Sequence, residues 1–174
     1  MIELLRQRRS VRAYTDQPIE SEKIKILQEA ALRSPTSRNL NPWHFIFVDD
    51  AALIKRLSRA KQHGSAFLSG APLAVAIAGD TTVSDVWVED CSIAAILLQL
   101  TAQSLGLGSC WVQIRLRQQN EYTTSQTFVQ ELLDLPEHLH VEAIIGIGYP
   151  AEEKPGIPYE KLQFEKIHKN RVSQ

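Results

Sequence analysis

The chain of 174 residues fits one domain better than two, and its 19 basic and 20 acidic side chains leave a formal net charge of -1. That balance argues against a protein built mainly to bind nucleic acid or acidic lipid, which usually carries a basic excess. Hydrophobic residues make up 44% of the chain and charged residues 22%, which excludes wholesale disorder and leaves enough apolar surface for a core.

Helical and strand-like patterns alternate along the whole chain. Apolar residues at helical spacing predict helices, and short apolar runs predict buried strands. In chain order we expect a helix at 2–9, a helix at 21–33, a strand at 45–49, a helix at 51–61, a strand at 73–79, a helix at 86–105, a strand at 110–115, a helix at about 125–133 and a strand at 142–148. Ser21 and Asp50 are the expected N-caps of the second and third helices, because their side-chain oxygens can accept from free backbone N–H groups.

The helix expected at 86–105 is apolar around most of its circumference, and such a helix must be buried on nearly every side. We expect a subunit interface to cover what its own domain leaves open. Gly106 and Gly108 are expected to end this helix. The segment after Pro150 has no core periodicity and suggests an arm that wraps around a partner subunit.

The strands FIFV, LAVAIA and AIIGIG are nearly continuous apolar runs, which indicates a sheet covered on both faces. We therefore predict an α+β fold in which a mixed central β-sheet is covered by helices on both faces. The predicted domain spans residues 1–150, and the predicted arm spans residues 151–174.

The two cysteines, Cys91 and Cys110, lie far apart and form no CxxC motif, so we expect two core cysteines rather than a disulfide or a zinc site. The N-terminal segment lacks the apolar core of a signal peptide, and no apolar run reaches the length of about 18 residues that suits a membrane span. We therefore expect a cytoplasmic protein without a membrane partner.

Familiar catalytic signatures such as GxGxxG, GxSxG and HExxH do not occur in the sequence. His138 and His140 alternate at a loop-to-strand turn with no third ligand in view. We interpret them as surface residues and predict no metal site.

A basic cluster at residues 8–12 contains Arg8, Arg9, Ser10 and Arg12. Arginine forks suit a phosphate or another planar acceptor, because they form bidentate hydrogen bonds. A solvated basic surface is the alternative interpretation of this cluster.

Two further segments could contact a ligand. Residues 35–43 form a polar loop before a buried strand, where Asn39 and Asn41 suit the edge of a heteroaromatic ring. Gly146 and Gly148 end a buried strand, where a missing side chain lets the backbone approach a ligand. A plain turn would explain either segment as well.

Taken in order, these clusters resemble the nitroreductase family of FMN-dependent oxidoreductases. The similarity extends from Leu4 to about His168 and rests on the segments RRSVRAY, SPTSRNLNPWHF, AAILLQLTAQSLGLGSCWV, IIGIGYP and YEKLQFEKIH. It implies an intertwined homodimer whose long helix lies at the interface and whose C-terminal extension crosses to the other subunit. Two FMN sites would then lie at this interface, each built from both chains.

The resemblance implies that NAD(P)H reduces the flavin, which then reduces a nitroaromatic, a quinone or a similar electron-poor small molecule in a ping-pong hydride transfer. The cofactor carries this chemistry, so no catalytic side chain is predicted.

The implied FMN contacts fall into four groups. Arg8 and Ser10 would contact the phosphate and ribityl end, Arg12 would reach the pyrimidine edge, and Arg9 shares the motif. The other subunit would supply Pro35, Thr36, Ser37 and Asn39. The segment beside the flavin would be Trp111, Val112, Gln113 and Ile114. Gly146 and Gly148 would let a strand end pass the phosphate, with Lys154 or Lys161 as a second cation.

This sequence departs from the family pattern at several positions. Asn41 is shorter than the frequent glutamine, which weakens a ring-edge contact. Ile114 replaces a small residue, so it would offer only its backbone and its bulk would narrow the substrate side. His63 lies near a family contact position, although an exposed helix end explains it as well.

Two alternatives remain at this stage. One is an enzyme of the same fold with a single dedicated substrate, as in relatives that dehalogenate aromatic rings or fragment flavin, with a lid formed by residues 115–125. The other is a non-catalytic module whose basic cluster binds a phosphate or a flavin.

Overall fold

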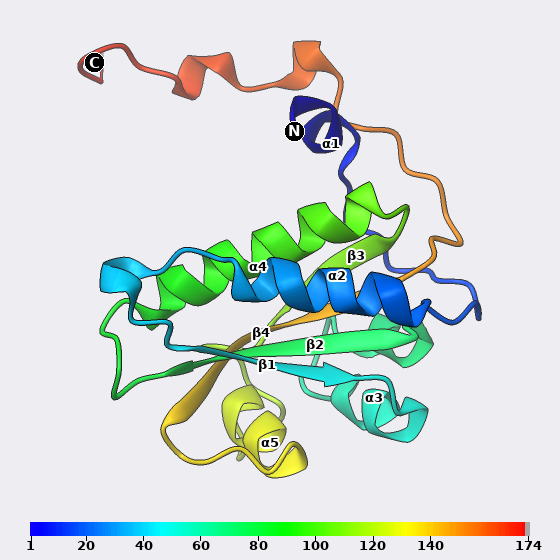
Figure 1. Cartoon of the computed structure of the whole chain (residues 1–174), viewed down its shortest axis with the longest axis vertical. Coiled ribbons are helices and arrows are strands. Elements are labelled where there is room, and N and C mark those ends of the chain that lie inside the picture. Colours follow the sequence, from blue (N-terminus) through cyan, green and yellow to red (C-terminus); the bar gives the residue numbers. More distant parts are fainter. Residues whose placement is uncertain (173–174) are drawn as a thin grey trace.

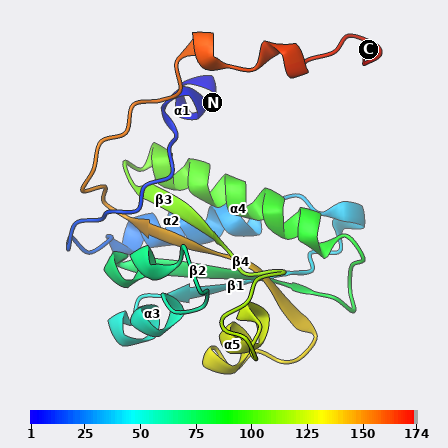
Figure 2. The same ribbon diagram turned by 180° about the vertical axis from the view of Figure 1, so that it is seen from behind.

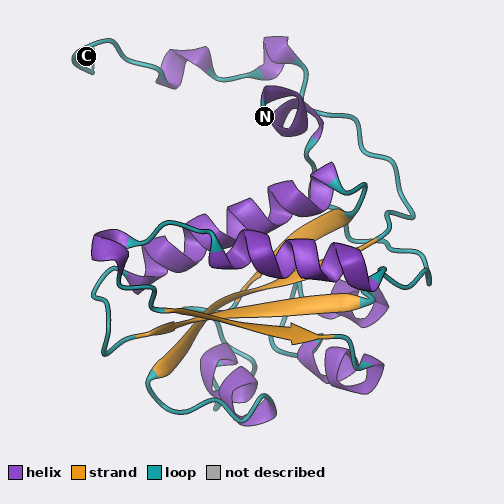
Figure 3. Ribbon diagram, viewed as in Figure 1, coloured by secondary structure: helices purple, strands orange, loops and turns teal. Residues whose placement is uncertain are grey.

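The computed structural model describes residues 1–172. Its centre is a four-stranded sheet in the order β1-β2-β4-β3. The strands are β1 (Trp43–Val48), β2 (Leu73–Asp80), β3 (Gly108–Gln113) and β4 (Leu139–Gly148). Figure 3 shows these strands as one twisted layer between two layers of helices.

All the paired strands of this sheet are antiparallel. The prediction of a mixed sheet is therefore wrong for the described strands. Parallel pairing within residues 1–172 is limited to an isolated bridge between Ser10 and Ser109. The apolar runs were correctly assigned to buried strands, but helices on both faces make a strand apolar whichever way it runs.

The helices are α1 (Ile2–Gln7), α2 (Ser21–Leu32), α3 (Ala51–Leu57), α4 (Trp87–Ser104) and α5 (Ser125–Leu132). Helices α2 and α4 cover one face of the sheet, and α3 and α5 cover the other, as both views show (Figures 1 and 2). Each face has its own core, centred on residues such as Leu27, Leu98 and Ile145 on one side. Ile54 and Val129 belong to the core on the other side. The expected coverage of both faces is confirmed.

The predicted N-caps have opposite outcomes. The Asp50 carboxylate accepts a hydrogen bond from the Leu53 N–H at 2.6 Å, which confirms the cap of α3. Ser21 is instead the first residue inside α2, whose N-cap is Glu20 and makes no side-chain capping bond. At the end of α4, Gly106 adopts a φ of 76°, the left-handed conformation expected after a helix.

The long helix α4 packs its small and apolar residues onto the sheet, and Cys91 and Leu98 are fully buried. On its outer side Ile93 and Ile96 remain 40% and 39% exposed. One chain therefore leaves part of the apolar circumference of α4 uncovered.

The segment after β4 first contacts its own chain and then leaves it. The Ala151 N–H donates to the Ala13 carbonyl at 2.9 Å, and Gly156 lies against the Arg6 carbonyl. Beyond this point residues 157–172 lead away past α1 (Figures 1 and 2). They contain two 3₁₀ turns, Tyr159–Lys161 and Phe164–Lys166. The remaining short 3₁₀ segments are Ser37–Asn39 and Ala66–Gly70.

None of the helices in residues 1–172 combines the length and the apolar character needed to cross a membrane.

Candidate functional site

The basic cluster lies along the first residues of the edge strand β3. Ser10 forms a bridge with Ser109, and the Val11 N–H donates to the Ser109 carbonyl at 3.0 Å. The Tyr14 hydroxyl lies 2.7 Å from the Val11 carbonyl oxygen and 3.1 Å from that of Gly146. Burial raises the pKa of Tyr14, so its hydroxyl remains a hydrogen-bond donor. These bonds hold the N-terminal segment against the sheet.

Positive charge converges on Cys110, which lies in β3. Burial raises the pKa of this thiol, while Arg12, the Ser10 hydroxyl, Lys154 and Arg8 all act in the opposite direction. Burial has the larger effect, so the thiol stays protonated. Both cysteines are free and buried, which confirms their expected place in the core.

Glu152 and Lys154 hold this cluster together. The Glu152 carboxylate accepts from the Arg12 N–H at 2.8 Å and from Lys154 Nζ at 2.6 Å. Lys154 Nζ also donates to the Ser10 carbonyl at 3.1 Å. The bond from the Arg12 N–H is the largest effect that lowers the pKa of Glu152. One carboxylate therefore organises the backbone of the cluster and neutralises its lysine.

Two of the guanidinium groups keep their charge available. Within residues 1–172, neither Arg8 nor Arg12 has a carboxylate within ion-pair distance. Arg12 instead lies over the Phe67 ring, 5.9 Å from its centroid. Arg9 points elsewhere and donates to the Pro155 carbonyl. An anion at this edge of the sheet would therefore meet Arg8 and Arg12 first.

The last residues of β3 alternate between the two faces of the sheet. Val112 and Ile114 are 1% and 0% exposed and belong to the core on the α3–α5 side. Trp111 and Gln113 project to the other face, where Trp111 Nε1 donates to Gln113 Oε1 at 2.9 Å. The Ile114 N–H already donates to the Glu142 carbonyl at 3.1 Å, so it is not free for a ligand. The expectation that the bulk of Ile114 narrows a substrate space is wrong, because the side chain lies in the core.

The outer edge of β3 carries free backbone groups. The Ser109 carbonyl faces outward to Val11, and alternate residues of an antiparallel strand point their N–H and C=O to the same edge. Trp111 and Gln113 therefore present their backbone donors and acceptors at this edge. No other strand of the described chain pairs there.

The polar loop between α2 and β1 lies at the other end of α4. The Ser37 N–H donates to buried Asp90 at 2.9 Å, and Arg38 pairs with Asp85 at 2.8 Å. Arg38, Asn39 and Asn41 adopt positive φ angles between 51° and 55°. Such left-handed backbone is uncommon for residues other than glycine, so the loop has a specific shape that its bonds to the start of α4 maintain.

The two halves of the predicted site are thus far apart in one chain. The basic cluster packs near the C-terminal end of α4, where Val11 touches Gly108, whereas Ser37 bonds at its N-terminal end. Helix α4 has 18 residues, which corresponds to about 27 Å. Figure 1 shows this separation directly. One chain does not bring Pro35, Thr36, Ser37 and Asn39 to the arginines.

Gly146 and Gly148 have a packing role. A Cβ on Gly146 would lie 2.8 Å from Leu68, and one on Gly148 would lie 2.6 Å from Pro72. The space next to both glycines is therefore filled by side chains of the same chain. The expectation that these glycines leave room for a ligand is wrong, because they leave room for Leu68 and Pro72.

Lys154 and Lys161 differ in position. Lys154 contacts the basic cluster, whereas Lys161 lies on the exposed arm beyond α1. Within one chain, Lys154 alone of the two reaches Ser10.

Sequence reasoning missed three residues of this region. Glu152 and Phe67 come from segments distant from the cluster, and no local motif marks them. Lys61, together with His63 and Arg117, lines a small cavity of about 260 Å³. Burial, followed by the charge of Arg117, lowers the pKa of Lys61. Grouping of titratable residues of this kind becomes visible only in the folded chain.

No cluster of three metal-ligating side chains occurs in the part of the chain that the structure describes.

The comparison with known families agrees with this geometry. The model of the nitroreductase family matches residues 5–63 and 59–149, which together cover most of the chain.

The chain belongs to the nitroreductase family.

This nitroreductase is 35% identical over 175 residues to an Archaeoglobus fulgidus protein provisionally named NADH dehydrogenase/NAD(P)H nitroreductase, with 98% of this chain and 97% of the relative covered. The structure of an FMN-dependent nitroreductase from Clostridium difficile R20291 matches with a TM-score of 0.97 at 43% identity, over 98% of this chain and 99% of that one. A Bacillus subtilis protein named FMN reductase is 27% identical, over 98% of this chain and 75% of the relative. The nitroreductase is accordingly an oxidoreductase.

Proposed function

We propose that two copies of this nitroreductase form a homodimer with an FMN site at each end of the shared interface. The observation that carries this proposal is the separation of two half-sites at opposite ends of α4. A two-fold partner can place the polar loop of one chain beside the basic cluster of the other. The uncovered Ile93 and Ile96 on the outer side of α4 support such an interface.

The residues of the basic cluster fit the anionic and polar parts of FMN. Arg8 and Ser10 would hold the phosphate and ribityl end, and Arg12 would hold the pyrimidine edge of the ring. Lys154 would be a weaker second cation, because it already pairs with Glu152. Free backbone groups of Trp111 and Gln113 at the open edge of β3 would accept and donate along the ring. Val112 and Ile114 would contact FMN least, because their side chains are buried and their backbone groups face β4.

The remaining predicted contacts keep narrower roles in this proposal. Pro35, Thr36, Ser37 and Asn39 would come from the other subunit. Gly146 and Gly148 would act by letting β4 pack closely next to the cluster. Arg9 lies aside, and Lys161 would reach an FMN only as part of the arm of a partner.

We further propose the reaction as transfer of electrons from NAD(P)H to a small electron-poor acceptor such as a nitroaromatic or a quinone. FMN would supply reversible two-electron chemistry when bound. The protein would supply orientation and positive charge, because Arg12 would stabilise negative charge at the ring edge. The names of the similar Archaeoglobus and Bacillus proteins support this choice of donor and cofactor.

A dedicated substrate is the second candidate function. A Rhodospirillum rubrum protein named 5,6-dimethylbenzimidazole synthase is 28% identical over 93% of this chain and 87% of the relative. Against it, residues 115–125, the segment expected to form a lid, fold back on themselves. The Gln119 N–H donates to Thr123 at 2.9 Å, and the Ser125 N–H donates to Arg117 at 2.9 Å. A screen of FMN-loaded protein with nitroaromatics, quinones and reduced flavin would separate the two candidates.

The experiment that tests FMN binding replaces Arg8 and Arg12 together by glutamine. Each hydrogen bond to a charged group contributes about 1.5–3 kcal/mol, so the pair should weaken binding at least about 100-fold. Binding is measured by titration of apoprotein with FMN, followed by flavin absorption and NAD(P)H oxidation with an acceptor.

The matched control is Arg33→Gln, an exposed arginine on α2 that pairs with Glu29. It should bind FMN like the original chain. A protein that takes up no FMN, or a double variant that binds it unchanged, would overturn the proposal; the first outcome would favour the non-catalytic phosphate-binding module.

A further inference from the structure

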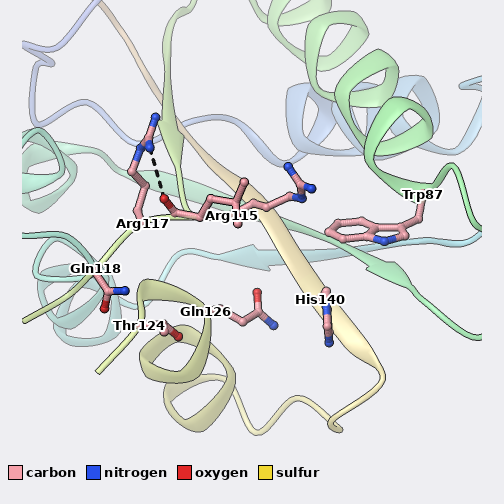
Figure 4. A pocket seen from close by; sticks show the side chains of 8 residues that line it. Trp87, Arg115, Arg117, Gln118, Thr124, Gln126 and His140 are labelled. Atoms are coloured by element: carbon pink, nitrogen blue, oxygen red, sulfur yellow. Dashed lines mark hydrogen bonds between the residues drawn. The ribbon is translucent and has the colours of Figure 1, made fainter. Parts of the chain in front are cut away.

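A second cavity lies at the opposite end of β3 from the basic cluster. It has a volume of about 570 Å³ and lies between the first turn of α4, the start of β4 and the start of α5. Figure 4 shows Trp87, Arg115, Gln126 and His140 directed toward a common space. Its volume falls within the range of small-molecule sites, about 300–1,000 Å³. None of its lining residues belongs to the proposed FMN site.

The lining of this cavity is positively charged. Arg115 and Arg117 line it, together with His140, and no carboxylate does. Among the residues that the structure describes, neither arginine takes part in an ion pair. Arg115 does interact electrostatically with one buried carboxyl group, that of Glu142, which is 5% exposed. The positive charge of Arg115 lowers the pKa of Glu142 and so favours its charged form.

The N-terminus of α5 adds to this charge. Thr124 caps the helix by accepting from the Thr127 N–H at 3.0 Å, and Thr124 and Gln126 both line the cavity. The first turn of a helix carries partial positive charge that favours an anion nearby. The two arginines and one helix end thus point to a negatively charged occupant.

The cavity also has an aromatic wall. The Trp87 ring lies 6.0 Å from the Arg115 guanidinium carbon and 5.9 Å from the His140 ring, which meets it edge-on at 88°. Trp87 is fixed from behind, because it packs directly on Gly79 of β2, where a Cβ would lie 2.6 Å from the indole. A planar ring could therefore pack against a preformed surface.

Gln126 makes the floor of the cavity rigid. Its amide oxygen accepts from the Val141 N–H at 2.7 Å, and its amide nitrogen donates to the Leu139 carbonyl at 3.4 Å. The Gln126 amide is thus committed to β4 and is not free to neutralise or solvate a ligand. Arg115, Arg117 and His140 remain as the groups that can bind one.

We propose that this cavity binds a planar aromatic carboxylate, with its ring against Trp87 and its carboxylate on the Arg115 guanidinium. A guanidinium matches a carboxylate through two parallel hydrogen bonds, and an indole offers the apolar face that an aromatic ring requires. None of the residues that line this cavity is among those assigned to FMN, so the proposal goes beyond the proposed function.

The test compares two ligands of nearly equal shape. Naphthalene-2-carboxylate and naphthalene-2-carboxamide are titrated into the full chain, with and without FMN, by isothermal calorimetry. The carboxylate should bind once per chain and at least about tenfold more tightly than the carboxamide, because only the carboxylate pairs with Arg115.

Variants assign the binding to this cavity. Arg115→Gln should weaken the carboxylate at least about tenfold and leave the carboxamide unchanged, while Trp87→Leu should weaken both. Arg33→Gln is the control and should change neither. The Arg8→Gln, Arg12→Gln double variant should bind the carboxylate normally, so failure of the FMN proposal would not be mistaken for failure of this one.

Three results would overturn the inference. These are equal binding of the two naphthalene ligands, no binding of either ligand, and an Arg115→Gln variant with unchanged affinity. Inorganic phosphate is titrated as a competitor: if it displaces the carboxylate at equal concentration in both the original chain and Trp87→Leu, the site is a general anion site and the aromatic assignment is wrong.

Discussion

Glu142 on β4 is a buried carboxyl group with half of its hydrogen-bonding capacity unused. It is 5% exposed; its Oε1 accepts from Gln113 Nε2 at 3.3 Å, and its Oε2 has no partner among the described residues. Burial raises the pKa of Glu142, and the bond from Gln113 and the charge of Arg115 only partly offset this. Gln113 in turn binds Trp111, so this carboxyl group supports the end of β3.

The raised pKa predicts a dependence of stability on pH. The folded state binds the Glu142 proton more tightly than the unfolded state, whose pKa is near the ordinary value of 4.5. The contribution of this residue to stability is therefore complete below about pH 4 and is lost as the pH rises through the folded pKa. The Glu142→Gln side chain stays neutral at every pH. As the pH rises toward neutral, the free energy of unfolding of the variant should therefore increase relative to that of the original chain by about 1 kcal/mol or more.

Urea denaturation at several pH values measures this difference. The control is Glu121→Gln, an exposed carboxyl group on the 115–124 loop, which should differ from the original chain by a constant amount. A pH-independent difference for Glu142→Gln would contradict the assignment.

At the scale of elements, α4 packs closely on β2 because Gly79 has no side chain at the contact. A Cβ on Gly79 would lie 2.6 Å from Trp87 Cε3 and 2.9 Å from its Cβ. The close contact brings the first turn of α4, which contains Asp90, within reach of the polar loop. The position of a binding loop thus depends on how closely a helix approaches a strand.

Gly79→Ala should therefore destabilise the protein by about 1–3 kcal/mol, because overpacking forces the indole and the start of α4 to move. Gly70→Ala is a matched control: nothing lies within 4 Å of the position of its Cβ, and its φ is not positive. That variant should stay within about 0.5 kcal/mol of the original chain. Urea denaturation measures both, and equal stability of the two variants would contradict the packing argument.

At the scale of the whole molecule, one chain exposes apolar side chains on two separate parts. Ile93 and Ile96 line the outer side of α4, and the arm exposes 72% of Ile167 and 46% of Phe164. An arm of this kind gains stability only by packing against another surface, which in the proposed dimer would be a second copy of the chain.

Ile96→Glu should therefore weaken the dimer at least about 100-fold, because an interface would bury an unpaired charge at a cost of several kcal/mol. Light scattering after size-exclusion chromatography should report a mass of two chains for the original protein and one for the variant. FMN uptake should fall with it, since in the proposed dimer each FMN site is built from both chains. Tyr122→Glu, which changes a side chain that is 93% exposed on a distant loop, should alter neither. A monomer that binds FMN fully would contradict the shared site.

Local patterns were sufficient to predict most elements of the fold. The strands, the long helix and the Asp50 cap depend on side-chain spacing within a few residues, which the sequence displays directly. The N-cap assigned to Ser21 is wrong because the same short side chain fits either side of a helix start. The prediction of a mixed sheet is wrong because an apolar strand sequence indicates burial but not the direction in which the strand runs.

The sequence by itself determined which family pattern the chain carries, where its helices and strands lie, and which arginines are candidates for an anion. Only the tertiary structure decided that Glu152 joins the Arg12 backbone to Lys154, that Gly146 and Gly148 serve packing, and that Trp87, Arg115 and His140 share a cavity. These relations join residues that are distant in sequence. They depend on how the strands pair and how closely α4 approaches the sheet, and no local periodicity records either.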